Sequence, residues 1–403
     1  MRKTTIASNI KPISNIIAIT GPTACGKTAL VQKIARKEDI IINADSRQLY
    51  KHLNIGVAKP STPEQIAYPY RLIDHQPLHK PFTAYDFLEH VKTTVLEQQH
   101  NPHSSRIFIV GGTLFYFSAL ENGLIDLKVD DSLSEQLNRE YMSYGLPKLR
   151  AELKERDLDH FNQIDKNNPR RIIRALALLR THQQPLKTLQ RKRLPFPYRL
   201  HKIILIPPKQ TLWKTIETRA ENMFINDRLI HEVKQILKQG ISKSVLLKHK
   251  TIGYLEITEY LNGFYSRETA LAKIIKRTKL LAKHQITWLK KQQHAHFIFL
   301  GAPTDFITPH HTANTPHHTS TGHPPTTCHF SSTKQKSPRH ATNKKSQQKR
   351  SATSTSLIEN WSLTPDNIVM NNNKVYFAKT SDQCRAIAVK LCEECSHYPH
   401  SQV

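Results

Sequence analysis

The sequence predicts an α/β fold: a P-loop parallel sheet core with a helical insertion domain and C-terminal helices, followed by a mostly disordered tail. Three observations lead to this prediction. A phosphate-binding motif stands between a β-prone run and a helical segment. Strand-like and helix-like patterns then alternate, which is typical of a parallel sheet. Residues 308–356 contain too few large apolar side chains to bury a core of their own.

The phosphate-binding motif has the Walker A spacing G-x-x-x-x-G-K-[S/T]. An apolar strand at 16–19 precedes it and a helix at 29–36 follows it. Gly21 and Gly26 allow backbone torsions that a side chain would forbid, so the loop can turn its N–H groups onto phosphate oxygens at a helix N-terminus. The predicted phosphate-binding residues are Gly21, Pro22, Thr23, Ala24, Cys25, Gly26, Lys27 and Thr28.

Two side chains of this motif carry its chemistry. Lys27 supplies a mobile cation and Thr28 supplies a hydroxyl for magnesium. The motif predicts a pyrophosphate-like ligand but does not identify it, and an ordinary glycine-containing turn is the alternative interpretation.

The rest of the core follows in order. Asp45 stands just past a predicted strand, in the crevice where α/β folds bind ligands. A capping role in the turn after that strand is its alternative. Gly111-Gly112-Thr113 follows the strand at 106–110 directly. Strands are expected at 40–42, 71–75, 106–110 and 202–206, the last completing the sheet, and helices at 87–98 and 114–120.

Between the core strands and beyond them the pattern is helical. Helices are predicted at 133–144, 146–154 and 169–181 in an insertion, and at 210–223, 228–239, 252–262 and 267–291 after the strand at 202–206. The last of these is strongly basic. The chain then divides into a first part of the P-loop core at 13–129, the insertion at 130–200, core completion with basic helices at 201–300, and a low-complexity tail at 301–403.

The tail has two features of its own. A strand at 374–378 and a helix at 383–395 could form one small unit, and activity is expected to survive truncation after Phe299. Its cysteines and histidines are too closely spaced for a ββα zinc finger and are interpreted as an incidental cluster. They are Cys392, Cys395, His397 and His400.

The composition of the chain indicates which kind of partner and which cellular compartment to expect. The 403 residues carry a formal net charge of +27, which points to a polyanion, most simply nucleic acid; a solvated basic surface is the alternative. Five unevenly spread cysteines suit a reducing compartment. No apolar run reaches the ~18–20 residues of a membrane span. We therefore expect a soluble, cytoplasmic protein without a membrane partner.

At this point the motifs form an ordered series that resembles the bacterial tRNA dimethylallyltransferases over about residues 13–300. The matching segments are 21–28, 45–50, 55–60, Val110-Gly111-Gly112-Thr113, Asn168-Pro169-Arg170-Arg171 with Arg174, Ile252-Gly253-Tyr254, and Thr278 with 285–288.

The resemblance implies a reaction. The N6 amine of the adenine 3′-adjacent to the anticodon attacks the prenyl carbon of dimethylallyl diphosphate, and pyrophosphate leaves. Mg²⁺ would be the cofactor, and the tRNA anticodon stem-loop the macromolecular partner of a monomer. By resemblance, Asp45 is the general base, Lys27 and Thr28 are phosphate and magnesium ligands, Thr113 lies near the pyrophosphate bridge, and Arg219 faces phosphate.

The resemblance also implies tRNA contacts. They are Asp45, Ser46, Arg47, Gln48, Thr113, Pro169, Arg170, Arg171, Ile172, Ile173, Lys250, Thr251, Ile252, Gly253, Tyr254, Leu255, Lys279, Lys283, His284 and Gln285. Several positions depart from the family pattern, among them residues 25, 279 and 284. Cys25 replaces a common serine, and Lys279 and His284 replace arginines, which loses bidentate phosphate geometry.

Other functions stay open on the residues alone. A P-loop small-molecule kinase or ATPase predicts a carboxylate at a strand end, and the strand at 106–110 has none. An adenine-nucleotide prenyltransferase would not need the basic helices or the insertion. A non-enzymatic RNA-binding module would leave the phosphate loop unused. The helical arginines and the last basic helix could also be solvated faces.

Overall fold

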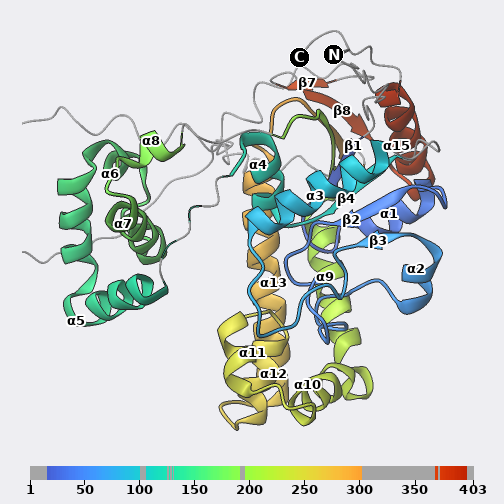
Figure 1. The fold of residues 1–403 in the computed structure, drawn as a ribbon. Helices are drawn as coiled ribbons and strands as arrows, with labels where there is room; N and C mark the ends of the chain where they lie inside the picture. The colour runs from blue at the N-terminus through green and yellow to red at the C-terminus, as the bar shows by residue number, and fades with distance from the viewer. Residues whose placement is uncertain are drawn as a thin grey trace, which may run out of the picture.

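The computed structural model describes residues 16–99, 106–124, 127, 129, 131–190, 196–301, 368–370 and 373–396. In these residues eight strands form one sheet in the order β3-β2-β4-β1-β5-β6-β8-β7 (Figure 1). All neighbours pair in parallel except β7 and β8. The strands are β1 Ile16–Thr20, β2 Ile40–Asn43, β3 Tyr70–Arg71, β4 Ile107–Gly111, β5 Leu200–Ile206, β6 Ala295–Phe299, β7 Ile368–Met370 and β8 Asn373–Phe377.

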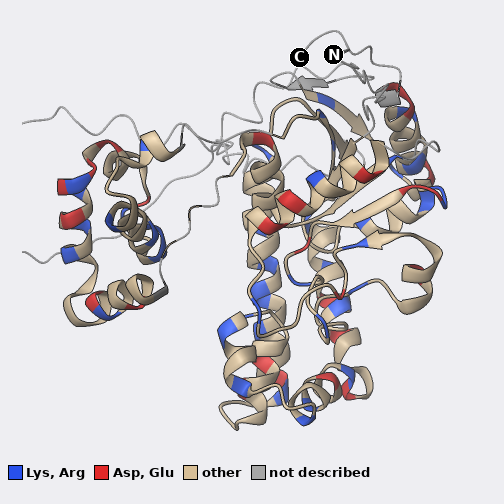
Figure 2. Ribbon diagram, viewed as in Figure 1, with Lys and Arg blue, Asp and Glu red and all other residues tan. Residues whose placement is uncertain are grey.

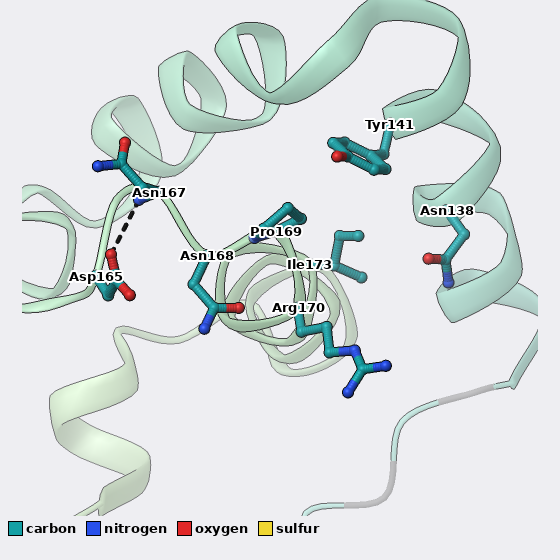
Figure 3. A pocket seen from close by; sticks show the side chains of 8 residues that line it. All are labelled: Asn138, Tyr141, Asp165, Asn167, Asn168, Pro169, Arg170 and Ile173. Atoms are coloured by element: carbon teal, nitrogen blue, oxygen red, sulfur yellow. Dashed lines mark hydrogen bonds between the residues drawn. The ribbon is translucent and has the colours of Figure 1, made fainter. Parts of the chain in front are cut away.

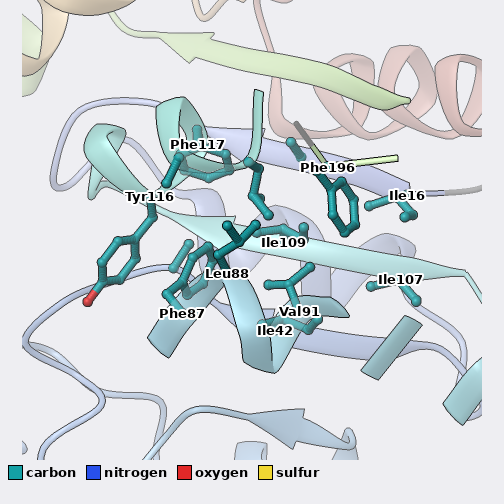
Figure 4. Packing of buried hydrophobic residues seen from close by; sticks show 14 of the residues in the cluster. Ile16, Ile42, Phe87, Leu88, Val91, Ile107, Ile109, Tyr116, Phe117 and Phe196 are labelled. Atoms are coloured by element: carbon teal, nitrogen blue, oxygen red, sulfur yellow. The ribbon is translucent and has the colours of Figure 1, made fainter. Parts of the chain in front are cut away.

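The central strands are continuous apolar runs because helices cover both faces of the sheet. On one face, Phe87 and Leu88 of α3 (Ala84–Gln99) and Phe117 of α4 (Leu114–Asn122) pack against Ile16 and Ile109 (Figure 4). Because side chains alternate along a strand, Ile17 and Ile19 point to the opposite face. There they meet α1 (Lys27–Ile34) and α15 (Ser381–Ser396).

Two predictions about the sheet are corrected. The strand expected at 71–75 is only Tyr70–Arg71, because the chain turns through left-handed torsions at Leu72 (φ 60°) and Asp74 (φ 50°). The strand at 202–206 was expected to complete the sheet, and this is wrong. Three more strands continue the sheet beyond β5, and β6 was not predicted at all.

The C-terminal strand and helix belong to this core instead of forming a separate unit. Strand β8 pairs in parallel with β6, from His296 opposite Lys374 to Phe299 opposite Phe377. The buried amide of Asn373 accepts from the Ala295 N–H (2.7 Å) and donates to the Gln292 carbonyl (2.8 Å). The segment 308–356, expected to be disordered, lies outside the described residues.

The insertion is helical, as predicted, with an apolar core of its own that includes Leu137, Leu149 and Leu176. Helix α5 (Asp131–Arg156) is broken at Gly145 (φ 73°), so it corresponds to the two helices expected there. Arg180 ties the insertion together by ion pairs with Glu140 (2.8 Å) and Glu152 (2.6 Å). The other helices are α6 Leu158–Gln163, α7 Pro169–His182 and α8 Leu186–Gln190, of which α6 and α8 were not predicted.

A second group of helices, α9 to α13, follows the insertion in the sequence and extends from the sheet. Helices α9 and α13 pack side by side and carry the smaller helices at their far ends (Figure 1). No helix in the described part of the chain is both long and apolar enough to cross a membrane. The remaining helices are α2 Thr62–Ala67, α9 Lys209–Phe224, the 3-10 turn Ile225–Asp227, α10 Arg228–Lys238, α11 Lys243–His249, α12 Tyr254–Leu261 and α13 Arg267–Leu289.

Candidate active site

The phosphate loop joins β1 to α1 as the Walker A motif predicts. Gly26 caps the helix with a left-handed backbone (φ 89°), and it is exposed. Gly21 is needed for space, because a Cβ there would lie 2.6 Å from Cys25 Sγ and 2.7 Å from the Leu205 carbonyl oxygen. Lys27 Nζ reaches across the loop to the carbonyls of Gly21 (3.1 Å) and Pro22 (2.7 Å). Its ammonium group therefore lies over the concave side of the loop.

The Cys25 side chain lies in the core beneath the loop, where its sulfur also accepts a long contact from Lys27 Nζ (3.8 Å). The Cys25 side chain is buried among the apolar residues of α1 and α15, and burial raises the pKa of its thiol. The thiol therefore stays protonated at neutral pH and adds no charge to the loop. This agrees with the expectation that the backbone of residue 25, not its side chain, serves the phosphate.

The ends of β2 and β4 are joined beside the loop. The Ala44 N–H donates to the Val110 carbonyl (2.7 Å), and the Thr113 N–H donates to the Ala44 carbonyl (3.1 Å). The approach is so close that a Cβ on Gly111 would lie 2.1 Å from the Ala44 carbonyl oxygen. Thr113 Oγ1 accepts from the Ser46 N–H (2.8 Å), which leaves its own proton for another acceptor. Asp45 and Thr113 are thus held as neighbours.

Asp45 uses one carboxylate oxygen for the backbone. Its Oδ1 accepts from the N–H groups of Arg47 (2.8 Å) and Gln48 (3.4 Å). The capping role considered as an alternative is therefore present. Oδ2 takes no part in these bonds, so capping by Oδ1 does not exclude proton acceptance by Oδ2.

Arg219 of α9 lies near enough to Asp45 for their charges to interact. Burial lowers the pKa of its guanidinium, and the charge of Asp45 opposes that shift. A buried guanidinium has a strong preference for an anionic neighbour. The phosphate-facing role expected for Arg219 stays a prediction.

Gln285 was expected to contact tRNA, but its side chain points inward. It is 7% exposed. Its Oε1 accepts from the Thr23 N–H (2.8 Å), and its Nε2 donates to the Gly112 carbonyl (2.8 Å). No sequence pattern pointed to this bridge, since only the phase of helix α13 determines which way the amide faces.

Several other residues that were predicted to contact tRNA have side chains that are buried or hydrogen-bonded within the protein. Ile172 and Tyr254 are fully buried, and Thr251 is 3% exposed. Tyr254 donates to Glu232 and accepts from the Gly56 N–H (3.3 Å). Gln48 donates to the carbonyl groups of residues 57 and 58. In this structure these side chains serve packing and internal hydrogen bonds, and contacts of these residues with tRNA stay a prediction.

The remaining predicted contacts fall into two exposed groups. On α13, Lys283 and His284 are exposed, and Figure 2 shows basic residues along this helix. Lys279 of the same helix is paired with Glu217 (2.5 Å), while Arg47 lies half-buried beside Asp45. Exposed or half-buried on the insertion and the α11–α12 region are Pro169, Arg170, Arg171, Ile173, Lys250, Ile252 and Leu255.

The insertion also carries a pocket of about 550 Å³. Asn138 and Tyr141 of α5 face Pro169 and Ile173 of α7 across it, with Arg170 at its edge (Figure 3). Asn168 accepts from the Arg171 N–H (3.4 Å) and so caps α7. The positive end of α7 therefore opens on this pocket.

Of the cysteine and histidine cluster in the tail, the structure describes only the cysteine end. Cys392 is fully buried against the face of the sheet that α1 covers. His397 and His400 lie outside the described residues, and of the side chain of Cys395 nothing is described.

Comparison with known proteins gives one consistent result. A family model described as IPP transferase matches residues 48–292. A tRNA dimethylallyltransferase of Natranaerobius thermophilus is 34% identical over 291 residues, which covers 71% of this chain and 86% of the relative. One from Janthinobacterium is 33% identical over 73% of this chain and 94% of the relative.

Solved structures agree with the sequence relatives. The full-length tRNA isopentenylpyrophosphate transferase of Bacillus halodurans matches with a TM-score of 0.50 and 29% identity, over 71% of this chain and 90% of that one. A eukaryotic dimethylallyltransferase acting on tRNA has the same fold, with a TM-score of 0.60 at 20% identity.

Proposed function

The chain belongs to the IPP transferase family, and on that premise we propose that it transfers a dimethylallyl group from dimethylallyl diphosphate to N6 of the adenine 3′-adjacent to the anticodon of tRNA, releasing pyrophosphate. One observation carries the assignment of residues. Hydrogen bonds between the ends of β2 and β4 hold Asp45 and Thr113 together, and the Gln285 side chain joins the Gly112 carbonyl to the Thr23 N–H of the phosphate loop.

The diphosphate binds in the P-loop, where backbone N–H groups and Lys27 neutralise its charge. Charge neutralisation of this kind is already in place when the leaving group departs, so it requires no reorganisation. Thr113 donates its hydroxyl proton to a pyrophosphate oxygen, since the bond that its oxygen accepts from the Ser46 N–H leaves that proton available.

Magnesium fits the residues at the start of α1. Thr28 is half-buried there, and no hydrogen bond of its hydroxyl is found within the described residues. Magnesium keeps waters and phosphate oxygens as ligands and needs few from the protein, so one hydroxyl beside a diphosphate suffices. When bound, the ion would neutralise further charge on the leaving pyrophosphate.

Asp45 serves the incoming amine. The N6 lone pair is delocalised into the adenine ring, so the amine is a poor nucleophile until its proton is removed. As the new C–N bond forms and the C–O bond to pyrophosphate breaks, Oδ2 accepts that proton. The adenine must leave its stack to reach this point, and the exposed cations of α13 hold the RNA through its phosphates.

We further propose a cytoplasmic monomer. Buried, unbridged thiols at Cys25 and Cys384 suit a reducing compartment. Size-exclusion chromatography with light scattering tests the monomer.

The function is tested by incubating the protein with radiolabelled dimethylallyl diphosphate, magnesium and one of three acceptors: tRNA, AMP or none. We expect label in tRNA only, and nuclease digestion should locate it on the adenosine next to the anticodon. Label in AMP would instead identify an adenine-nucleotide prenyltransferase. Phosphate transfer from ATP with no prenyl transfer would identify a kinase.

A further inference from the structure

Gln285 is an unusual residue for its place on α13. The helix is strongly basic, yet this polar side chain turns inward and is 7% exposed. Both ends of its amide are used, because Oε1 accepts from the Thr23 N–H and Nε2 donates to the Gly112 carbonyl, each at 2.8 Å. An amide is suited to this position, because one side chain must accept from one strand end and donate to another.

The two bonded groups belong to the two loops of the proposed site. Thr23 lies in the phosphate loop, and Gly112 directly precedes Thr113. The fit is tight on the Gly112 side, where an added Cβ would lie 2.7 Å from Gln285 Nε2. The amide of Gln285 therefore fixes the distance between the loop that holds diphosphate and the loop that holds Thr113.

The other side of the same helical turn faces solvent. Lys283 and His284, immediately before Gln285, are exposed. A helix is stiff over one turn, so a displacement of this turn by RNA phosphates moves the amide of Gln285 with it. We propose that Gln285 is a positioning residue that couples tRNA binding on α13 to the geometry of the phosphate loop and Thr113. This proposal rests on the proposed function.

The coupling has a definite thermodynamic form. If tRNA and the diphosphate ligand each favour the same placement of α13 and its two loops, each must raise the affinity of the other by the same factor, typically about 5–150-fold. Loss of the amide should bring that factor close to 1. It should also slow transfer, since a misplacement of about 1 Å between reacting groups costs roughly 100-fold.

The test uses the full chain and four variants. Gln285→Met removes both bonds but keeps the size of the side chain. Gly112→Ala pushes the amide away from the opposite side without altering α13. The double variant completes a cycle, and Gln235→Met, at an exposed glutamine of α10, makes the same substitution elsewhere. For each, we would measure the melting temperature, the single-turnover rate of transfer, and the Kd for magnesium pyrophosphate with and without tRNA.

We expect Gln285→Met and Gly112→Ala each to slow transfer by at least tenfold and to remove the effect of tRNA on the pyrophosphate Kd. The double variant should be no slower than the slower single one, because both substitutions break the same bridge. Gln235→Met should behave as wild type.

Additive losses in the double variant, or an undiminished effect of tRNA in Gln285→Met, would overturn the proposal, as would transfer within twofold of wild type in Gln285→Met. If Gln285→Met does not fold, Gly112→Ala alone decides, because it leaves α13 intact. The wild-type arm separates this outcome from failure of the proposed function, since absence of transfer to tRNA there refutes the function itself.

Discussion

Replacing Asp45 with asparagine separates the two roles that the structure gives this residue. Oδ1 caps the turn after β2 by accepting from the Arg47 and Gln48 N–H groups, while Oδ2 is assigned to the substrate amine. Asparagine keeps an oxygen for the cap but cannot take the proton. A lost general base costs about 10²–10⁴-fold in rate, which corresponds to roughly 3–5 kcal/mol of activation free energy.

The stability of the variant should change little. The cap survives in Asp45→Asn, whereas Asp45→Ala also removes it at a cost of about 1 kcal/mol, equivalent to about 2–4 °C in melting temperature for a chain of this kind. The two variants should therefore share the same loss of rate but differ in melting temperature. Asparagine should also leave diphosphate affinity unchanged or higher, because a negative charge is removed from beside the ligand.

The assay combines single-turnover transfer to tRNA with thermal unfolding for both variants. Asp86→Asn is the matched control, since Asp86 caps the start of α3 by accepting from the Thr83 N–H (2.7 Å) and lies outside the site. It should transfer at the wild-type rate. If a stable Asp45→Asn protein prenylates tRNA within about threefold of wild type, Asp45 is a cap and the base must be sought elsewhere.

Three further predictions address the loop, the C-terminal unit and the insertion. Lys27→Ala should abolish transfer, at a cost of roughly 3 kcal/mol or more, with tRNA affinity in a filter-binding assay unchanged; near-normal turnover would refute its role. Truncation after Phe299, expected from the sequence to leave activity intact, should instead lower the melting temperature and weaken diphosphate binding, because it uncovers α1; an unaltered, fully active truncation would show that α15 is dispensable. Arg180→Leu should destabilise the protein by roughly 1–3 kcal/mol. Arg180 holds the pKa of Glu140 and of Glu152 below the ordinary 4.5, so this loss should be full above about pH 4.5 and shrink as the pH falls further; a loss independent of pH would contradict the ion pairs.

The sequence was most informative where function demands a local pattern. The Walker A loop sets β1 and α1 in place, and Asn168 marks the start of α7, because a cap and a glycine turn depend only on nearby residues. It failed at β6, a five-residue run that follows a basic helix without a turn signal of its own. Its pairing with β8 joins residues separated by more than seventy positions, and no local pattern encodes such a contact.

The site shows the same division. The sequence singled out Lys27, Thr28 and Asp45 by motif and position, and the resemblance added Thr113; their catalytic roles stay predictions. The direction of a side chain was not accessible from the sequence, and Gln285 illustrates this. Its neighbours suggested an RNA-facing surface, but helical phase and the space left by Gly112 turned it inward.

The packing of α15 on α1 has a consequence for how the chain is made. Leu30 and Ile34 are synthesised early, while Cys384 and Leu391, which cover them, follow roughly 350 residues later. At about 5–20 residues per second on the ribosome, the apolar back of the phosphate loop waits roughly 20–70 s for its cover. The edge of β6 is unpaired only late in that interval, from the synthesis of Phe299 until β8 follows roughly 75 residues later. The nascent chain therefore offers a chaperone an apolar helix and an open strand edge, both of which disappear when the last helix docks.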